Sequence, residues 1–182
     1  MRIRTTAIPD VLLLEPQIHA DRRGLFMESF NRREFAAAVG RDVDFVQDNH
    51  SHSAKGVLRG LHYQVAPHAQ AKLVRVIEGE IFDVAVDLRR DSATFGRWTG
   101  EILSAENHRQ LWIPEGLAHG FLALTDRAQV LYKASAYYSA AHERSLRWDD
   151  AALAIGWPKV GDLILSDKDA AAPSFSDADL FD

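Results

Sequence analysis

The sequence predicts an all-β fold, a jelly roll or small β-barrel with a few short peripheral helices. Glycine and proline residues separate short apolar segments along most of the chain, and this favours many strands joined by turns over a helical bundle. Several of the segments alternate apolar and polar residues with the period of two that marks a half-buried strand. With 182 residues, the chain suits a single domain spanning residues 1–182, because one core of this size buries most of its apolar surface.

Period-two alternation locates the expected strands. The stretch from Ile77 to Ile81, centred on Gly79, predicts a hairpin turn between two of them. The set as a whole favours a barrel or a double-sheet jelly roll. The expected strands are Leu25–Phe30, Val57–Gln64, Lys72–Ile77, Ile81–Leu88, Gln110–Ile113, Phe121–Thr125 and Val130–Tyr138.

One helix is predicted over Arg32–Val39. Asn31 can cap its first turn, Glu34 stands where the partner of a capping box belongs, and Gly40 follows the last turn. A short helical pattern also covers Asp149–Ile155, and the tail at 170–182 is expected to pack loosely.

Composition excludes several classes of function. Hydrophobic residues make up 47% and charged residues 26% of the chain, as in ordinary globular proteins. The net charge of −5 and the lack of a basic block argue against nucleic-acid binding. There is no cysteine, so disulfides and thiolate chemistry are excluded. The apolar run Val11–Leu14 is too short for a signal peptide or a membrane span. We therefore expect a cytoplasmic protein with no membrane partner.

The densest group of unusual residues lies in the segment Gly56–Gln64. Strict alternation places His62 on one face of this strand and Arg59 on the other, unless Gly60 marks a bulge that turns one of them. We expect such a bulge. Taken alone, a single histidine here is more often a hydrogen-bonded structural residue than a catalytic one.

Further polar residues share faces with apolar ones on the neighbouring segments. Each has an ordinary structural interpretation on its own, such as an edge lysine or a buried tyrosine with a satisfied hydroxyl. The residues are Gln70 and Lys72, the two carboxylates Asp83 and Asp87, the second histidine His119, and the tyrosines Tyr132 and Tyr138. The second inward histidine strengthens the prediction of a pocket, and either carboxylate could orient a histidine or pair with Lys72.

Taken together, these segments resemble the dTDP-4-dehydrorhamnose 3,5-epimerase family over about residues 10–175. The resemblance implies a cupin-like jelly roll and a homodimer in which N-terminal residues complete the neighbour's site. The segments that carry the resemblance are Asp21–Phe26, Gly56–Gln64, Gln70–Lys72, Asp87–Arg89, Ser92–Gly96, Ile113–Phe121, Tyr132–Lys133 and Ser166–Asp169.

The resemblance also implies roles for individual residues. It implies that His62 is the general base, that Asp169 is its partner carboxylate, that Tyr132 is the general acid, and that Lys72 lies beside the sugar carbonyl. Tyr138 matches the residue that stacks on the thymine. No metal and no cofactor are implied. The other implied substrate-binding residues are Arg23, Phe26, Glu28, Gln47, Asn49, Arg59, His119, Glu143 and Lys168.

The implied reaction converts dTDP-4-dehydro-6-deoxy-D-glucose into dTDP-4-dehydro-L-rhamnose by inverting C3 and C5. Inversion beside a ketone needs a base on one face of the sugar and an acid on the other. A fixed ammonium such as Lys72 stabilises the enolate between the two steps. An arginine such as Arg59 suits the diphosphate, because its guanidinium can form paired hydrogen bonds to phosphate oxygens.

Three alternatives stay open at this point. A related enzyme could invert C3 only or C5 only. A metal-dependent cupin oxygenase or isomerase could use the pair His50 and His52 together with further histidines. A non-catalytic sugar-binding jelly roll would need the arginines and the stacking tyrosine, but no opposed base and acid. The residue patterns also leave open whether Asp169 or Asp83 orients His62.

Overall fold

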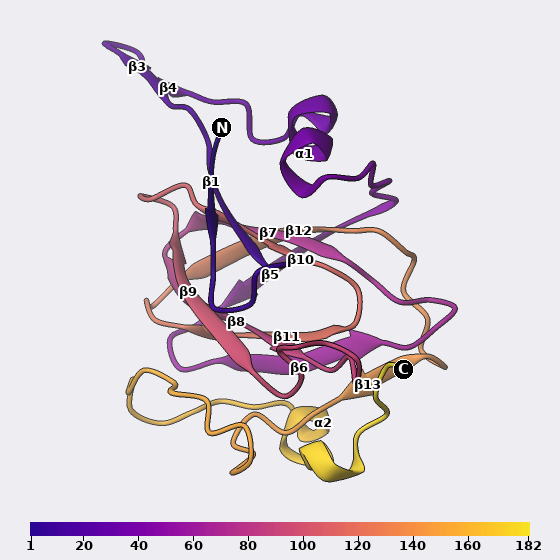
Figure 1. Ribbon diagram of the computed structural model, residues 1–182. Helices are drawn as coiled ribbons and strands as arrows, with labels where there is room; N and C mark the ends of the chain where they lie inside the picture. Colours follow the sequence, from indigo (N-terminus) through magenta and orange to yellow (C-terminus); the bar gives the residue numbers. More distant parts are fainter.

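The computed structural model covers residues 1–182 and consists mainly of antiparallel strands in two facing sheets (Figure 1). This architecture confirms the prediction of an all-β fold with few short helices. The six-stranded sheet has the order β1 (Arg2–Thr5), β2 (Leu12–Glu15), β10 (Gln110–Ile113), β7 (Lys72–Glu78), β12 (Ala128–Ala134) and β5 (Gln47–Ser53). The five-stranded sheet has the order β13 (Glu143–Ser145), β6 (Leu58–Gln64), β11 (Leu117–Ala123), β8 (Glu80–Asp87) and β9 (Trp98–Ser104).

The main core fills the space between the two sheets. Most of its 15 buried apolar residues come from strands of both sheets, including Val74 and Val130 on one side and Ile81 and Phe121 on the other. Alternate residues of each strand point to this interface, as the period-two pattern requires. At one end of the sandwich, the residues that point between the sheets are polar instead of apolar, and the candidate site lies there.

The turn at Gly79 differs from the prediction. β7 and β8 are consecutive, but they belong to different sheets and do not pair, so the expected hairpin is wrong. Gly79 instead carries the chain from one sheet to the other. A side chain at this corner would clash with the carbonyl oxygen of Arg127, because a Cβ there would lie 1.9 Å from it.

Helix α1 (Arg32–Val39) forms as predicted. The Asn31 side chain accepts a hydrogen bond from the Glu34 N–H at 3.3 Å, and the Gly40 N–H donates to the Ala36 carbonyl. Phe35 is buried against Leu14 and Trp112, so the helix covers part of the outer face of the six-stranded sheet.

The C-terminal region from residue 149 onward was predicted less well. Residues 149–155 form turns, so the predicted helix there is wrong. The tail at 170–182 packs beneath the five-stranded sheet instead of lying loose (Figure 1), because Phe175, Leu180 and Phe181 contact the apolar cluster on its outer face. This region contains α2 (Asp167–Ala170) and the 3-10 turn η1 (Phe175–Asp177). None of the helices has the length and apolarity needed to cross a bilayer.

A two-stranded hairpin, β3 (His19–Asp21) and β4 (Gly24–Phe26), extends away from the sandwich (Figure 1). We call residues 18–28 the arm. The strand predicted over Leu25–Phe30 ends at Phe26. Two other predicted strands are also shifted: β11 runs from Leu117 to Ala123, and β12 ends at Ala134.

Candidate active site

A cavity of about 520 Å³ opens between the two sheets, a volume typical of small-molecule sites. The sequence predicted most of its polar lining. β5, β7 and β12 contribute residues from one sheet, β6, β11 and β13 from the other, and α2 closes one side. The predicted residues that line it are Gln47, Asn49, Arg59, His62, Lys72, His119, Tyr132, Tyr138, Glu143, Lys168 and Asp169.

His62 and Asp169 form a close pair in this cavity. The His62 Nε2 lies 2.5 Å from the Asp169 Oδ1. Asp169 is buried on α2, whose N-terminus is capped by the Ser166 hydroxyl. Burial raises the pKa of the Asp169 carboxyl, but the hydrogen bonds from His62 and Ser166 outweigh it, and the pKa lies below its usual value. An ionised carboxylate accepts the Nε2 proton, so the Nδ1 of His62 is the ring nitrogen that can take up another.

A β-bulge on β6 turns His62 and Arg59 into the same cavity. His119 pairs with His62, but Phe121 pairs with Arg59, so β6 has one residue more than β11 over this interval. Gly60, with φ of +125°, lies in the bulge, and the backbones of Gly60 and Gly120 approach closely. The bulge predicted at Gly60 is confirmed.

Three buried ionisable groups lie behind the His62 pair. The Lys72 ammonium donates to the His62 carbonyl at 3.2 Å, and the His119 Nε2 lies 2.7 Å from the Asp83 Oδ1. Burial lowers the pKa of Lys72 to about 8, although Asp83 and Glu143 act in the opposite direction. Burial also lowers the pKa of His119, against the effect of Asp83. The contact to His62 therefore comes from Asp169, and Asp83 contacts His119.

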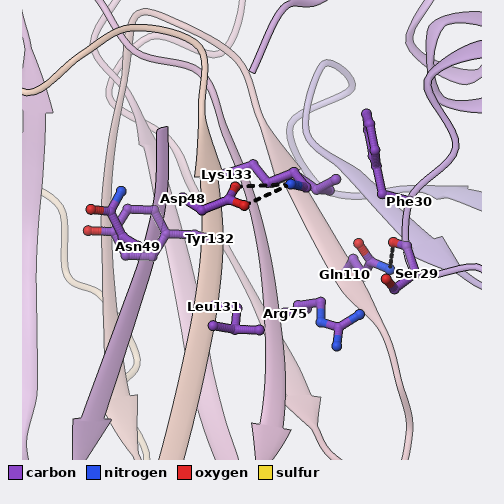
Figure 2. A pocket seen from close by; sticks show the side chains of 10 residues that line it. Ser29, Phe30, Asp48, Asn49, Arg75, Gln110, Leu131, Tyr132 and Lys133 are labelled. Carbon is purple, nitrogen blue, oxygen red and sulfur yellow. Dashed lines mark hydrogen bonds and ion pairs between the residues drawn. The ribbon is translucent and has the colours of Figure 1, made fainter. Parts of the chain in front are cut away.

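Tyr132 enters the cavity from β12, on the sheet opposite His62. Figure 2 shows the alternation along β5 and β12: Asp48 and Lys133 approach each other, with the Lys133 Nζ 2.9 Å from the Asp48 Oδ1, while Asn49 and Tyr132 point the other way. Burial raises the pKa of the Tyr132 phenol, with a smaller opposite effect from Arg59. The phenol is therefore protonated at neutral pH and can donate a proton.

The mouth of the cavity carries Tyr138, Glu143 and Lys168. The Tyr138 hydroxyl donates to the Glu143 Oε2 at 2.9 Å, and the Lys168 Nζ lies 2.6 Å from the Glu143 Oε1. Tyr138 was predicted within a strand that also carries Tyr132, but it lies four residues beyond the end of β12, at Ala134. Tyr138 as a whole is 56% exposed.

Three predicted substrate-binding residues lie outside the cavity, on the arm. Arg23 is paired with Asp21, Phe26 is 67% exposed, and Glu28 contacts Asn31. Within one chain they are not brought together with His62.

The histidine pair considered for a metal site faces away from the cavity. His50 and His52 are exposed, and they alternate with the cavity-lining residues of β5. The His50 Nε2 contacts the Gln129 Oε1 at 2.8 Å. No group of three or more histidine, cysteine, aspartate or glutamate side chains has an arrangement that could hold a metal ion.

Gln64 and Ser166 are among the polar cavity residues to which the sequence assigned no role. Gln64 lies two residues after His62 on the same strand and therefore on the same face. This alternation was the signal in the sequence that could have placed it in the cavity. Ser166 precedes a charged run and caps α2, and the short helix gave no periodic signal of its own.

Comparison with known proteins agrees with this geometry. The model of the dTDP-4-dehydrorhamnose 3,5-epimerase family matches residues 5–177. The chain belongs to this family. A dTDP-4-dehydrorhamnose 3,5-epimerase from Shigella flexneri is 59% identical over 100% of this chain and 99% of its own length.

Solved structures of the epimerase family superpose closely on this one. The dTDP-6-deoxy-D-glucose-3,5-epimerase of Legionella pneumophila, in complex with dTDP-4-keto-L-rhamnose, has a TM-score of 0.95 and 49% identity, covering 98% of this chain and 94% of its own. A 3'-monoepimerase from Streptomyces bikiniensis, in complex with dTDP-quinovose, has a TM-score of 0.90 and 38% identity, with coverages of 95% and 87%. The epimerase fold therefore occurs with one-carbon and two-carbon specificity.

Proposed function

We propose that this chain is a cofactor-independent isomerase that inverts C3 and C5 of dTDP-4-dehydro-6-deoxy-D-glucose, forming dTDP-4-dehydro-L-rhamnose for dTDP-L-rhamnose and cell-wall polysaccharide synthesis. The observation that carries the proposal is that two side chains enter the same cavity from opposite sheets. The imidazole of His62 and the phenol of Tyr132 enter one cavity from opposite sheets. A sugar ring between them has a base on one face and an acid on the other.

The proposed reaction moves only protons. The His62 Nδ1 removes the proton from the carbon beside the ketone, and the C–H electron pair forms the enolate. The Tyr132 hydroxyl then delivers its proton to the opposite face of the same carbon. His62 has gained a proton and Tyr132 has lost one, so exchange with solvent resets both groups before the second carbon reacts. No hydride moves, and the proposal includes no redox cofactor.

Lys72 is proposed to stabilise the enolate. Its ammonium is buried beside the His62 backbone, in a site where a fixed positive charge interacts strongly with a developing oxyanion. His119 would add a hydrogen-bond donor on the same side. Asp169 would hold His62 in one tautomer and stabilise the imidazolium after proton abstraction.

The nucleotide is proposed to bind toward the mouth. Arg59 would bind the diphosphate, because a guanidinium forms paired hydrogen bonds with phosphate oxygens. The exposed ring of Tyr138 would stack on the thymine. The remaining polar residues would hold the sugar and the nucleoside: Gln47, Asn49, Glu143 and Lys168.

We also propose that residues 1–182 act as one domain and that two chains form a cytoplasmic homodimer. The arm supports this, because Leu25 and Phe26 are 53% and 67% exposed on a hairpin that leaves the sandwich. In a dimer, Arg23, Phe26 and Glu28 of each arm would reach the cavity of the other chain.

The second candidate is a one-carbon epimerase, favoured by the similarity to the 3'-monoepimerase. One experiment separates the two functions. The protein is incubated with dTDP-4-dehydro-6-deoxyglucose in deuterated water, and the recovered sugar is analysed by NMR. We expect deuterium at both C3 and C5. Deuterium at C3 or C5 alone would identify the one-carbon enzyme, and its absence at both would favour a non-catalytic binder.

A further inference from the structure

The segment from Ser135 to Ser139 follows β12 and carries Tyr138. After the Ser135 N–H, which donates to the Ala71 carbonyl at 3.0 Å, its main chain no longer pairs with β5 or β7. Glutamine side chains bond to its main chain in place of a neighbouring strand. Gln70 Nε2 donates to the Ala136 carbonyl at 2.7 Å, and Gln64 Nε2 donates to the Tyr137 carbonyl at 3.2 Å. The Tyr138 N–H donates to Gln47 Oε1 at 2.9 Å, and the Ser139 N–H donates to Gln64 Oε1 at 2.7 Å.

Gln64 is central to this arrangement. It is the last residue of β6, and its side chain is buried, with 3% of the residue exposed. Besides its bonds to the 135–139 segment, its Nε2 donates to the His68 carbonyl at 2.7 Å. Both amide protons and the amide oxygen are thus used, and two loops are joined through one side chain. A glutamate could not replace it, because a carboxylate cannot donate to the two carbonyls.

The position of the Tyr138 ring depends on this main-chain support. Tyr138 is 56% exposed, and its one side-chain hydrogen bond is to Glu143. Residues outside the 135–139 segment therefore make few contacts that could hold the Tyr138 ring in place. A ring that is already held in place loses less conformational freedom when a ligand stacks on it.

We infer that Gln64 and Gln70 are positioning residues that fix Tyr138 for stacking on the nucleotide base. The inference rests on the proposed function, and it names residues that act on binding through Tyr138 and do not touch the reacting carbons. The two glutamines therefore set affinity for the nucleoside diphosphate, while His62 and Tyr132 set the rate of proton transfer.

The test uses Gln64→Met and Gln70→Met in the full chain, with dTDP as the probe in titration calorimetry. Base stacking on an aromatic side chain corresponds to about 5- to 150-fold in affinity. We expect Tyr138→Ala to weaken dTDP binding within that range, and each glutamine variant to weaken it by about 3- to 10-fold. KM for the sugar nucleotide should rise by a similar factor, with kcat changed less than about twofold.

Asn107→Leu provides a matched control. The Asn107 side chain also satisfies three main-chain groups, at the Ile102 carbonyl and the Ser104 and Arg109 N–H groups, in a turn away from the cavity. It should lower stability much as Gln64→Met does and leave dTDP affinity unchanged. Gln70→Met loses a single hydrogen bond, so it keeps the test valid where Gln64→Met fails to fold.

Double variants decide whether the glutamines act through Tyr138. In a Tyr138→Ala background, the glutamine substitutions should have little further effect on dTDP affinity, because the group they position is gone. Fully additive effects, or an equal loss of affinity in Asn107→Leu, would overturn the inference alone. Failure of the wild-type protein to bind dTDP would overturn the proposed function and the inference together.

Discussion

The positions of His62 and Tyr132 on opposite sides of one cavity predict separate roles in proton transfer, which two conservative substitutions can distinguish. His62→Asn removes the proposed base, so deuterium exchange at C3 and C5 should fall by at least about 10²-fold. Tyr132→Phe keeps the base, so abstraction should continue while return of a proton to the opposite face fails. The measurement is NMR of the sugar after incubation in deuterated water. Washed-in deuterium with retained configuration is expected for Tyr132→Phe, and normal inversion by that variant would rule out Tyr132 as the acid.

Lys72 predicts a pH-dependent stability. The pKa of Lys72 in the folded protein, about 8, lies below the ordinary lysine value of 10.5. Between these values the unfolded chain holds a proton that the folded chain has lost, so this group makes stability rise with pH across the window. Below pH 8 the buried, protonated Lys72 lowers the free energy of unfolding by its full amount, on the order of 3 kcal/mol.

The substitution Lys72→Met removes this cost. At about pH 7 the variant should be more stable than the wild type by up to about 3 kcal/mol, and the advantage should shrink as the pH rises toward 10. Urea unfolding of both proteins at several pH values measures it. The variant should also exchange deuterium about 10²-fold more slowly, because the enolate loses its cation. A stability difference that did not change with pH would contradict the assigned pKa.

At the scale of single residues, the sequence predicted which residues line the site better than it predicted which side chains contact each other. Alternation could place His62, Lys72 and His119 on inward faces, because strand parity depends only on local order. It could not decide between Asp169 and Asp83 as the partner of His62. Asp169 lies 107 residues further along the chain, and only the packing of α2 against β6 brings the two together.

At the scale of elements, the bulge on β6 depends on close contact of two backbones. A Cβ at Gly120 would lie 2.6 Å from the Arg59 carbonyl oxygen and 3.1 Å from the Gly60 Cα. Gly120→Ala should therefore destabilise the fold by about 1–3 kcal/mol. It should also lower activity by about 10²-fold, because His62 would be displaced. Thermal unfolding and the exchange assay measure the two effects.

Gly161→Ala is the matched control for this steric effect. Gly161 has φ of +91°, but nothing lies within 4 Å of its added Cβ, so only the cost of the backbone conformation is introduced. About 1 kcal/mol of stability should be lost, with activity retained. An activity loss in Gly161→Ala as large as in Gly120→Ala would show that the contact at the bulge is not the cause.

Element boundaries were the weakest predictions, for physical reasons. The period-two pattern of Val130–Tyr138 continues past Ala134, but the partner strands end there, and the main chain turns to glutamine side chains instead. The turn at Gly79 has the sequence of a hairpin, but it connects two sheets, because β7 pairs with β10 and β12. Local sequence patterns indicate which face of a strand a residue occupies, but which strands pair with each other depends on the whole fold.

At the scale of the molecule, the two-sheet architecture explains how distant residues meet. His62 lies on β6 of the five-stranded sheet and Tyr132 on β12 of the six-stranded sheet. The two residues line one cavity because the two sheets face each other. The family resemblance anticipated this arrangement, whereas composition and alternation could not. The arm is the remaining unexplained element, because its exposed residues have no role within one chain.

Subunit mixing tests the role of the arm. In the proposed homodimer, His62→Asn and Arg23→Ala should each abolish most activity when both chains carry the same substitution. In a mixed dimer, the chain with an intact His62 would receive the intact arm of the other chain, so one of its two sites would be complete. Random exchange of equal amounts should then restore about a quarter of wild-type activity. If each arm served its own chain, both sites of the mixed dimer would carry a defect and mixing would restore nothing. Activity assays after mild unfolding and refolding of the mixture distinguish the two outcomes, with size-exclusion light scattering to establish the dimer.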